Sequence, residues 1–178
     1  MARRPVMVFA GSFNPPHKGH METARTLASC CDTLYLVIGV NPNKKYDVSA
    51  EDRKKLLEAI VAEAGFENVK VITTTDYIWR FCKQVGATEL FRSVRTWKQD
   101  GGAERFLELQ NLYGPWLFLK KSMPTTFIEG NPKYAHVSST FIRSCVANGD
   151  ESMDGLVYCA NEIRKVYGPN SSEDTKET

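Results

Sequence analysis

The stretch that decides the fold is "VMVFAGSFNPPHKGH", Val6–His20. Its first five residues are apolar, which is typical of a buried β-strand. The next ten residues contain two glycines, two prolines and two histidines. Proline has no amide hydrogen and glycine tolerates tight turns, so this segment predicts a stiff loop that leaves the strand abruptly. His20 then lies where a helix can begin.

Apolar runs and helical patterns alternate along the rest of the chain. Strands are expected at residues 6–10, 33–40, 69–73, 89–94 and 125–130, and helices at residues 21–30, 50–65, 77–87, 103–114, 138–149 and 157–168. Ser49 and Asp52 resemble a capping box before the second helix. Near-continuous apolar strands fit a parallel sheet covered on both faces. The sequence therefore predicts an α/β fold, a Rossmann-like doubly wound five-stranded parallel sheet, in one domain over residues 1–168 with a disordered tail at 169–178.

Composition excludes several classes of protein. The chain has 178 residues, and its 23 basic and 21 acidic side chains give a net charge of +2, which argues against a dedicated nucleic-acid binder. No apolar run approaches the roughly 20 residues of a membrane helix. The five cysteines lack a metal-type CxxC spacing and are interpreted as free thiols in a reducing cytosol, so we expect a cytoplasmic protein without a membrane partner.

Polar and basic residues follow the expected strands. In parallel α/β sheets, ligands bind beyond the carboxyl ends of the strands. The segments there supply hydroxyls, imidazoles and cations, namely Ser12, His17, Lys18, His20, Lys44, Lys45, Arg92, Arg95, Ser138, Ser139 and Thr140. Such groups bind phosphate, especially at helix N-termini. Neither a Walker A loop nor a GxGxxG fingerprint occurs in the first loop, which weakens kinase and dehydrogenase interpretations.

The HxGH motif at His17–His20, followed late in the chain by SSTxxR at Ser138–Arg143, resembles the nucleotidyltransferase superfamily that carries a (T/H)xGH motif. The match extends in order to phosphopantetheine adenylyltransferases through "GSFNPPHKGH", "NPNKKYDVSAEDRKKLLEAI", "GATELFRSVR", "ELQ" and "YAHVSST". This resemblance implies transfer of AMP from ATP to 4′-phosphopantetheine, giving dephospho-coenzyme A and pyrophosphate. It also implies Mg²⁺ carried mainly by the ATP phosphates, coenzyme A as a product-like ligand, and a homo-oligomer, by resemblance a hexamer.

The resemblance also implies roles for individual residues. His20 and Lys44 are the expected catalytic residues. The acceptor side is assigned to Ser12, Lys44, Ile78 and Arg92. The ATP site is assigned to Ser12, Phe13, His17, His20, Ser93, Val94, Arg95, Glu108, Tyr134, Ala135, His136, Val137, Ser138, Ser139 and Thr140.

The sequence departs from the usual family pattern at several of these positions. Ser12 replaces a usual Thr, Asn14 a usual Asp, Ser93 the glycine of RGxR, and His17 the Thr of bacterial members. The loop "TWKQDGGAER", Thr96–Arg105, is longer than usual. Since "GSFNPP" and "SSTFIR" also resemble nicotinamide or nicotinate mononucleotide adenylyltransferases, that acceptor class is a second hypothesis. A non-catalytic nucleotide-binding module is a third.

Overall fold

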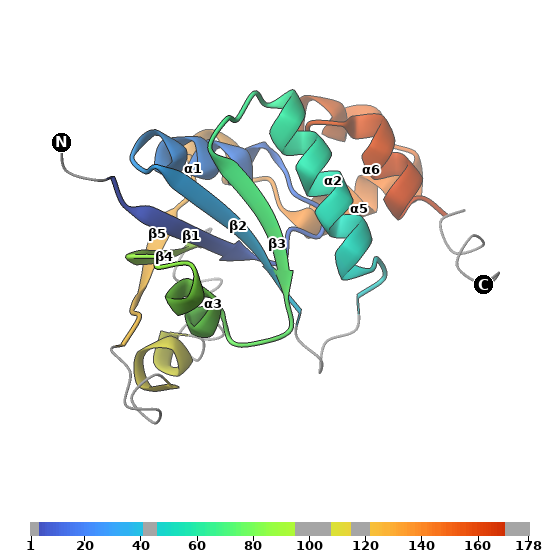
Figure 1. Ribbon diagram of the computed structural model, residues 1–178. Helices are drawn as coiled ribbons and strands as arrows, with labels where there is room; N and C mark the ends of the chain where they lie inside the picture. The colour runs from blue at the N-terminus through green and yellow to red at the C-terminus, as the bar shows by residue number, and fades with distance from the viewer. Residues whose placement is uncertain (1–3, 41–45, 95–107, 115–121, 170–178) are drawn as a thin grey trace.

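The computed structural model describes residues 4–40, 46–94, 108–114 and 122–169 (Figure 1). Its strands are β1 (Val6–Gly11), β2 (Thr33–Gly39), β3 (Val69–Thr74), β4 (Glu89–Val94) and β5 (Thr125–Glu129). Its helices are α1 (Lys18–Ser29), α2 (Ala50–Glu63), α3 (Ile78–Gln84), α5 (Ser139–Asn148) and α6 (Ala160–Tyr167), with two 3-10 helices, η1 (Pro132–Tyr134) and η2 (Glu151–Leu156). Residues 108–114 are also helical.

The five strands form one parallel sheet in the order β3-β2-β1-β4-β5. The chain builds outward from β1 to β3, then crosses to the other side of β1 and continues with β4 and β5. The strand order therefore reverses between β1 and β4, and the crevice at such a switch point is where ligands bind in this architecture. The predicted fold class is confirmed.

Alternate residues of the central strands face two separate cores, as the period of two in a β-strand requires. Phe9 of β1 and Leu36 of β2 pack in the larger core with residues of α1, α2, α5 and α6. Val8 and Val37 face the other way and pack with Trp79 and Cys82 of α3. Figure 1 accordingly shows α3 on the opposite side of the sheet from α2. The strands are apolar on both faces because helices cover both.

The first helix begins earlier than the sequence pattern predicts. α1 starts at Lys18 instead of Met21, because His17 acts as its N-cap residue with extended backbone. The two 3-10 helices were not predicted. Of the expected helix at 103–114, residues 103–107 lie outside the described residues, as does the tail beyond residue 169. Within the described part of the chain, no helix has both the length and the apolar character that crossing a membrane requires.

Candidate active site

The loop after β1 turns sharply at Phe13. This residue has a φ of 43°, which is left-handed backbone and uncommon for a bulky side chain. Its ring is buried edge-on against Phe9, with the ring centroids 5.6 Å apart, and it also contacts His20, with the centroids 5.3 Å apart. A Cβ on Gly11 would lie 3.1 Å from the Phe13 ring, so a side chain there would press on the turn.

Side chains from the C-terminal helices bind this loop directly. Ser139 in α5 donates its hydroxyl to the Pro15 carbonyl at 2.7 Å, and the Arg143 guanidinium donates to the Asn14 carbonyl. The Tyr167 hydroxyl at the end of α6 donates to Asn14 Oδ1 at 2.8 Å. The first loop and the SSTxxR helix are thus one hydrogen-bonded unit, although more than 120 residues separate them in the sequence.

His20 lies in the first turn of α1, and its Nδ1 atom accepts a hydrogen bond from the His17 backbone N–H at 3.3 Å. The two imidazole rings are tilted against each other with centroids 3.8 Å apart. Burial, and secondarily the neighbouring His17, lowers the pKa of His20 well below its usual value. His20 is therefore neutral at pH 7. Because Nδ1 accepts, the proton of the neutral ring lies on Nε2, which remains as a hydrogen-bond donor.

Gly19, the glycine of HxGH, lies where neighbouring atoms leave little room for a side chain. A Cβ on Gly19 would lie 3.0 Å from His17 Nδ1 and 3.2 Å from Tyr134 Cβ. Any side chain there would displace either the ring that lies against His20 or the segment that leads to α5. Gly19 therefore permits the close approach of the HxGH and "YAHVSST" segments.

The N-termini of α1 and α5 both point at this loop. Neither α1 nor α5 has an acidic residue in its first turn. Ser138 caps α5 by accepting from the Phe141 N–H at 3.1 Å, and Thr140 is exposed beside it. The positive ends of both helix dipoles, together with hydroxyl groups, favour binding of an anion such as phosphate.

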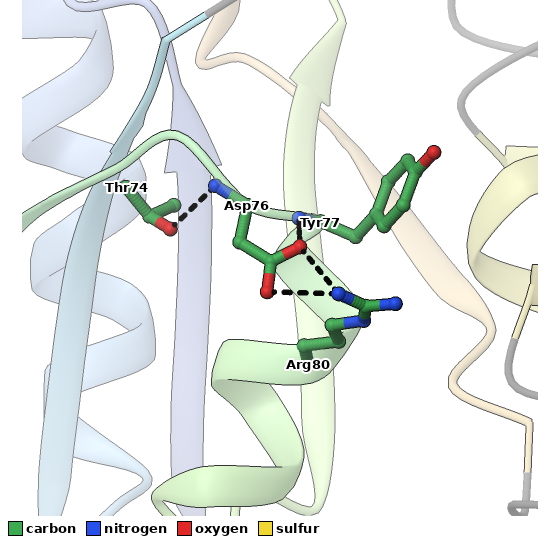
Figure 2. A network of polar contacts seen from close by, with 4 residues as sticks. All are labelled: Thr74, Asp76, Tyr77 and Arg80. Atoms are coloured by element: carbon green, nitrogen blue, oxygen red, sulfur yellow. Dashed lines mark hydrogen bonds and ion pairs between the residues drawn. The ribbon is translucent and has the colours of Figure 1, made fainter.

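A separate polar network fixes the beginning of α3 at the end of β3 (Figure 2). The Asp76 carboxylate accepts hydrogen bonds from the Tyr77 N–H at 2.7 Å and from the Arg80 guanidinium at 3.2 and 3.3 Å. The Asp76 backbone N–H donates to Thr74 Oγ1 at 3.1 Å. Ile78 follows directly, and its Cδ1 lies 3.5 Å from the position of a Cβ on Gly39 at the end of β2. The network thereby fixes the backbone of Ile78 at the same edge of the sheet as the β1 loop.

The structure brings together most of the predicted ATP-site residues. Ser12, Phe13, His17 and His20 lie in the β1 loop and the start of α1, and residues 134–140 form the segment before α5 together with its first turn. Phe13, Val94 and Val137 are each only 1% exposed as whole residues, so their side chains are not available to a ligand.

The other predicted residues that the structure describes come from β4, α3 and the helical segment 108–114. Arg92 and Ser93 are half-buried in the last half of β4, and Glu108 is half-buried at the start of the helical segment. Lys44 and Arg95, together with the longer loop, lie outside the described residues.

Sequence reasoning assigned no role to Arg53, Arg143 or Tyr167, which all contact the β1 loop. Arg53 precedes Leu56, Leu57 and Ile60 by three, four and seven residues, so its position on the apolar stripe of α2 was a readable signal. Tyr167 lies four residues after the buried Ile163 on α6, which is a similar but weaker signal.

The donor chemistry of this region suits phosphate better than a metal ion. Within the described ranges, no cluster of three or more His, Cys, Asp or Glu side chains could form a metal site.

A parallel sheet of this order, with HxGH after β1 and a hydroxyl-rich helix start after β5, defines a nucleotidyltransferase fold. Residues 8–145 match the cytidylyltransferase-like family, and the chain belongs to that family of nucleotidyltransferases.

Curated relatives and solved structures extend this result. The chain is 29% identical to the phosphopantetheine adenylyltransferase of Chromobacterium violaceum over 84% of this chain and 86% of the relative. It is 30% identical to that of Streptococcus pneumoniae (strain 70585) over 81% and 85%. Nicotinic acid mononucleotide adenylyltransferase of Plasmodium falciparum, solved with NaAD, superposes with a TM-score of 0.64 over 93% of this chain and 98% of that chain, at 11% identity. At that identity the likeness extends to the fold alone.

Proposed function

We propose that this protein transfers the adenylyl group of ATP to 4′-phosphopantetheine, releasing pyrophosphate and forming dephospho-coenzyme A. The observation that carries the proposal is the ordered set of segments "GSFNPPHKGH", "NPNKK", "RSVR" and "ELQ". Relatives with the name phosphopantetheine adenylyltransferase, at 29–30% identity over more than four fifths of both chains, support the same acceptor.

The nucleotide phosphates would bind between the N-termini of α1 and α5. Ser138 and Thr140 offer hydroxyls there, and Ser139 contributes a backbone N–H at the start of the helix. The absence of first-turn acids leaves the dipole of α5 uncompensated by its own side chains. Tyr134, Ala135 and His136 precede this helix and would cover the adenine. Ser93 and Val94, with Arg95 and Glu108, would line the other side of the ATP site.

The reaction requires little proton transfer from the protein. An oxygen of the acceptor phosphate, already ionised at neutral pH, attacks the α-phosphorus. The new O–P bond forms as the bond from the α-phosphorus to the bridging oxygen of pyrophosphate breaks. Catalysis can therefore come from positioning and from stabilisation of the charge that develops on the phosphoryl oxygens.

His20 is suited to that stabilisation because it is a neutral donor with a fixed tautomer. Its Nδ1 atom is occupied by the His17 N–H, so Nε2–H is the atom that would donate to a phosphoryl oxygen. A donor that is already oriented costs no reorganisation during the reaction. Lys44, in the "NPNKK" segment, would add a positive charge at the acceptor phosphate.

On the acceptor side, Ser12 and Arg92 would bind the phosphate of the acceptor, and the backbone of Ile78 would contact the pantetheine arm. Mg²⁺ bound to the ATP phosphates would supply charge neutralisation. A cytoplasmic homo-oligomer, a hexamer by resemblance, and coenzyme A as a product-like ligand remain predictions that accompany this function.

A mononucleotide acceptor is the second candidate, because "GSFNPP" and "SSTFIR" also resemble nicotinamide and nicotinate mononucleotide adenylyltransferases. Initial rates of pyrophosphate release with ATP and Mg²⁺, measured in parallel on 4′-phosphopantetheine and both mononucleotides, separate the two. Turnover on 4′-phosphopantetheine alone supports the proposal. Turnover on a mononucleotide alone replaces it and reassigns Arg92 and the "NPNKK" segment to a different acceptor.

A further inference from the structure

Arg53 is a buried cation directly behind the β1 loop. Arg53 is only 1% exposed, and its Nη1 atom donates to the Ser12 carbonyl at 2.7 Å. Its Nε atom donates to the Ser49 carbonyl at 3.3 Å, and its guanidinium lies 4.3 Å from the centroid of the Tyr46 ring. These contacts fix the side chain between the start of α2 and the loop that follows β1.

The positive charge of Arg53 has no ion-pair partner within the part of the chain that the structure describes. Taking a cation out of water costs several kcal/mol unless other groups compensate. Burial accordingly lowers the pKa of Arg53 from its usual value, an effect that neighbouring Tyr167 and Tyr46 partly oppose. A buried cation without an ion-pair partner, on a helix face otherwise made of leucine, isoleucine and valine, is unfavourable for folding alone, which points to a second role.

The geometry of the peptide group defines that role. Because the C=O and N–H of a trans peptide point in opposite directions, a Ser12 carbonyl directed at Arg53 turns the Phe13 N–H to the opposite side of the loop. Helix side chains also bond the carbonyls of Asn14 and Pro15. In both of these peptide groups the next residue is a proline, whose nitrogen carries no hydrogen. Among the peptide groups of this loop whose carbonyls are bonded by helix side chains, only the Ser12–Phe13 peptide therefore has an N–H that can donate.

The strained backbone at Phe13 makes this clamp necessary. A non-glycine residue at a φ of 43° persists only when its surroundings fix it. The ring of Phe13 is anchored by Phe9 and His20, and the preceding carbonyl is anchored by Arg53. Without the guanidinium, the Ser12–Phe13 peptide is free to rotate, while the ring remains in the core.

We propose that Arg53 is a positioning residue for nucleotide binding: it fixes the Ser12–Phe13 peptide so that the Phe13 N–H donates to a phosphate of the nucleotide. Its charge, one peptide behind the donor, adds to the attraction for the same anion. The inference rests on the proposed function, since it assumes that the anion at this loop is a nucleotide phosphate.

The test compares the affinities of ATP and adenosine, measured by calorimetry without any acceptor. Arg53→Met is expected to weaken ATP binding about tenfold or more and to leave adenosine binding within about twofold, because only the phosphates contact the Phe13 N–H. Arg25→Met is the matched control. Arg25 also donates to a backbone carbonyl, that of Ala64 at 2.9 Å, and lies over an aromatic ring, that of Phe66 at 4.8 Å, but it does not contact the β1 loop.

A purely structural role gives a different pattern. If Arg53→Met weakens ATP and adenosine equally, or neither, the inference is wrong. Should Arg53→Met fail to fold, Arg53→Lys decides: it keeps the charge but loses the two-point contact, so a smaller selective loss of ATP affinity is expected, and wild-type affinities for both ligands would overturn the inference.

Failure of the proposed function gives yet another result. In that case the wild-type protein binds ATP more tightly than adenosine but turns over none of the acceptors, and the effect of Arg53→Met on ATP affinity still decides the role of Arg53. A wild-type protein that does not prefer ATP over adenosine overturns both.

Discussion

The N-termini of α2 and α5 begin in the same way and then differ. Each follows a serine whose hydroxyl accepts an N–H three residues on, from Asp52 in α2 and from Phe141 in α5, both at 3.1 Å. In α2 the first turn contains Glu51 and Asp52, whereas the first turn of α5 contains no acidic residue.

Under the proposed function, the difference separates a helix start that stabilises the fold from one that would bind the nucleotide phosphates. Acidic side chains compensate the dipole of α2 internally. The dipole of α5, directed at the β1 loop with α1, is left for an external anion. The serine cap alone therefore does not distinguish the two, but the residues after it do.

The largest effect is expected at His20, where α1 meets the loop. His20→Ala should lower kcat by about 10²–10³-fold, the usual cost of removing one oriented donor to a developing charge. The affinity for ATP, measured separately, should change little because the backbone and α5 contacts remain. A kcat within threefold of the wild-type value contradicts the assigned role.

The next largest effect is expected from adding an acidic residue to the first turn of α5 or removing one from the first turn of α2. Thr140→Glu gives α5 a first-turn acid and should raise the KM for ATP about tenfold, while its free energy of unfolding stays equal or rises by about 0.3–1 kcal/mol. Glu51→Gln should lower the free energy of unfolding by about 0.3–1 kcal/mol and leave the KM for ATP unchanged. Thr140→Glu with a wild-type KM would remove the distinction between the helices.

Removing the serine hydroxyls that cap α2 and α5 tests the same difference between the two helices. Ser49→Ala and Ser138→Ala should each lower the free energy of unfolding by about 1 kcal/mol, since each leaves one N–H without its acceptor. Only Ser138→Ala should also raise the KM for ATP. Denaturant unfolding and steady-state kinetics on both variants check this, and an equal kinetic effect of the two would mean that ATP does not bind at α5.

The smallest effect concerns acid pH. Because burial lowers the pKa of His20 in the folded state, the unfolded chain takes up this proton more readily as the pH falls below about 6.5. The free energy of unfolding should therefore decrease as the pH falls through that region. His20→Asn should flatten this part of the pH profile. An unchanged slope in the variant would show that other groups cause the acid sensitivity.

The sequence predicts the layers of this fold well because the strands are apolar on both faces. The β4 bounds agree fully with the expected 89–94, and β1 and β2 agree to within one residue. The strand order was not predicted, since parallel pairing depends on crossover connections that leave no local pattern. The early start of α1 was missed because His17 and His20 cap the helix through a contact that only the folded loop provides.

The sequence indicates the segments of the proposed site where a short motif marks them, but not where tertiary contacts decide which residues take part. HxGH and the late serines indicated a phosphate site, and the structure brings both segments to one loop. Arg53 is flanked in the sequence by Asp52 and Lys54, which suggests a solvated charge. Its place on the apolar stripe of α2 hints at burial, but only the packing of α2 against the loop shows that it bonds to the Ser12 carbonyl.

The central claim is adenylyl transfer, and the fate of the phosphorus atoms of ATP tests it most directly. The protein would be incubated with Mg²⁺, 4′-phosphopantetheine and ATP labelled either at the α- or at the γ-phosphorus. We expect the α-label in dephospho-coenzyme A and the γ-label in pyrophosphate, with both transfers strongly reduced in His20→Ala. A γ-label on the acceptor, or no transfer of the α-label by folded protein that binds ATP, would contradict the account.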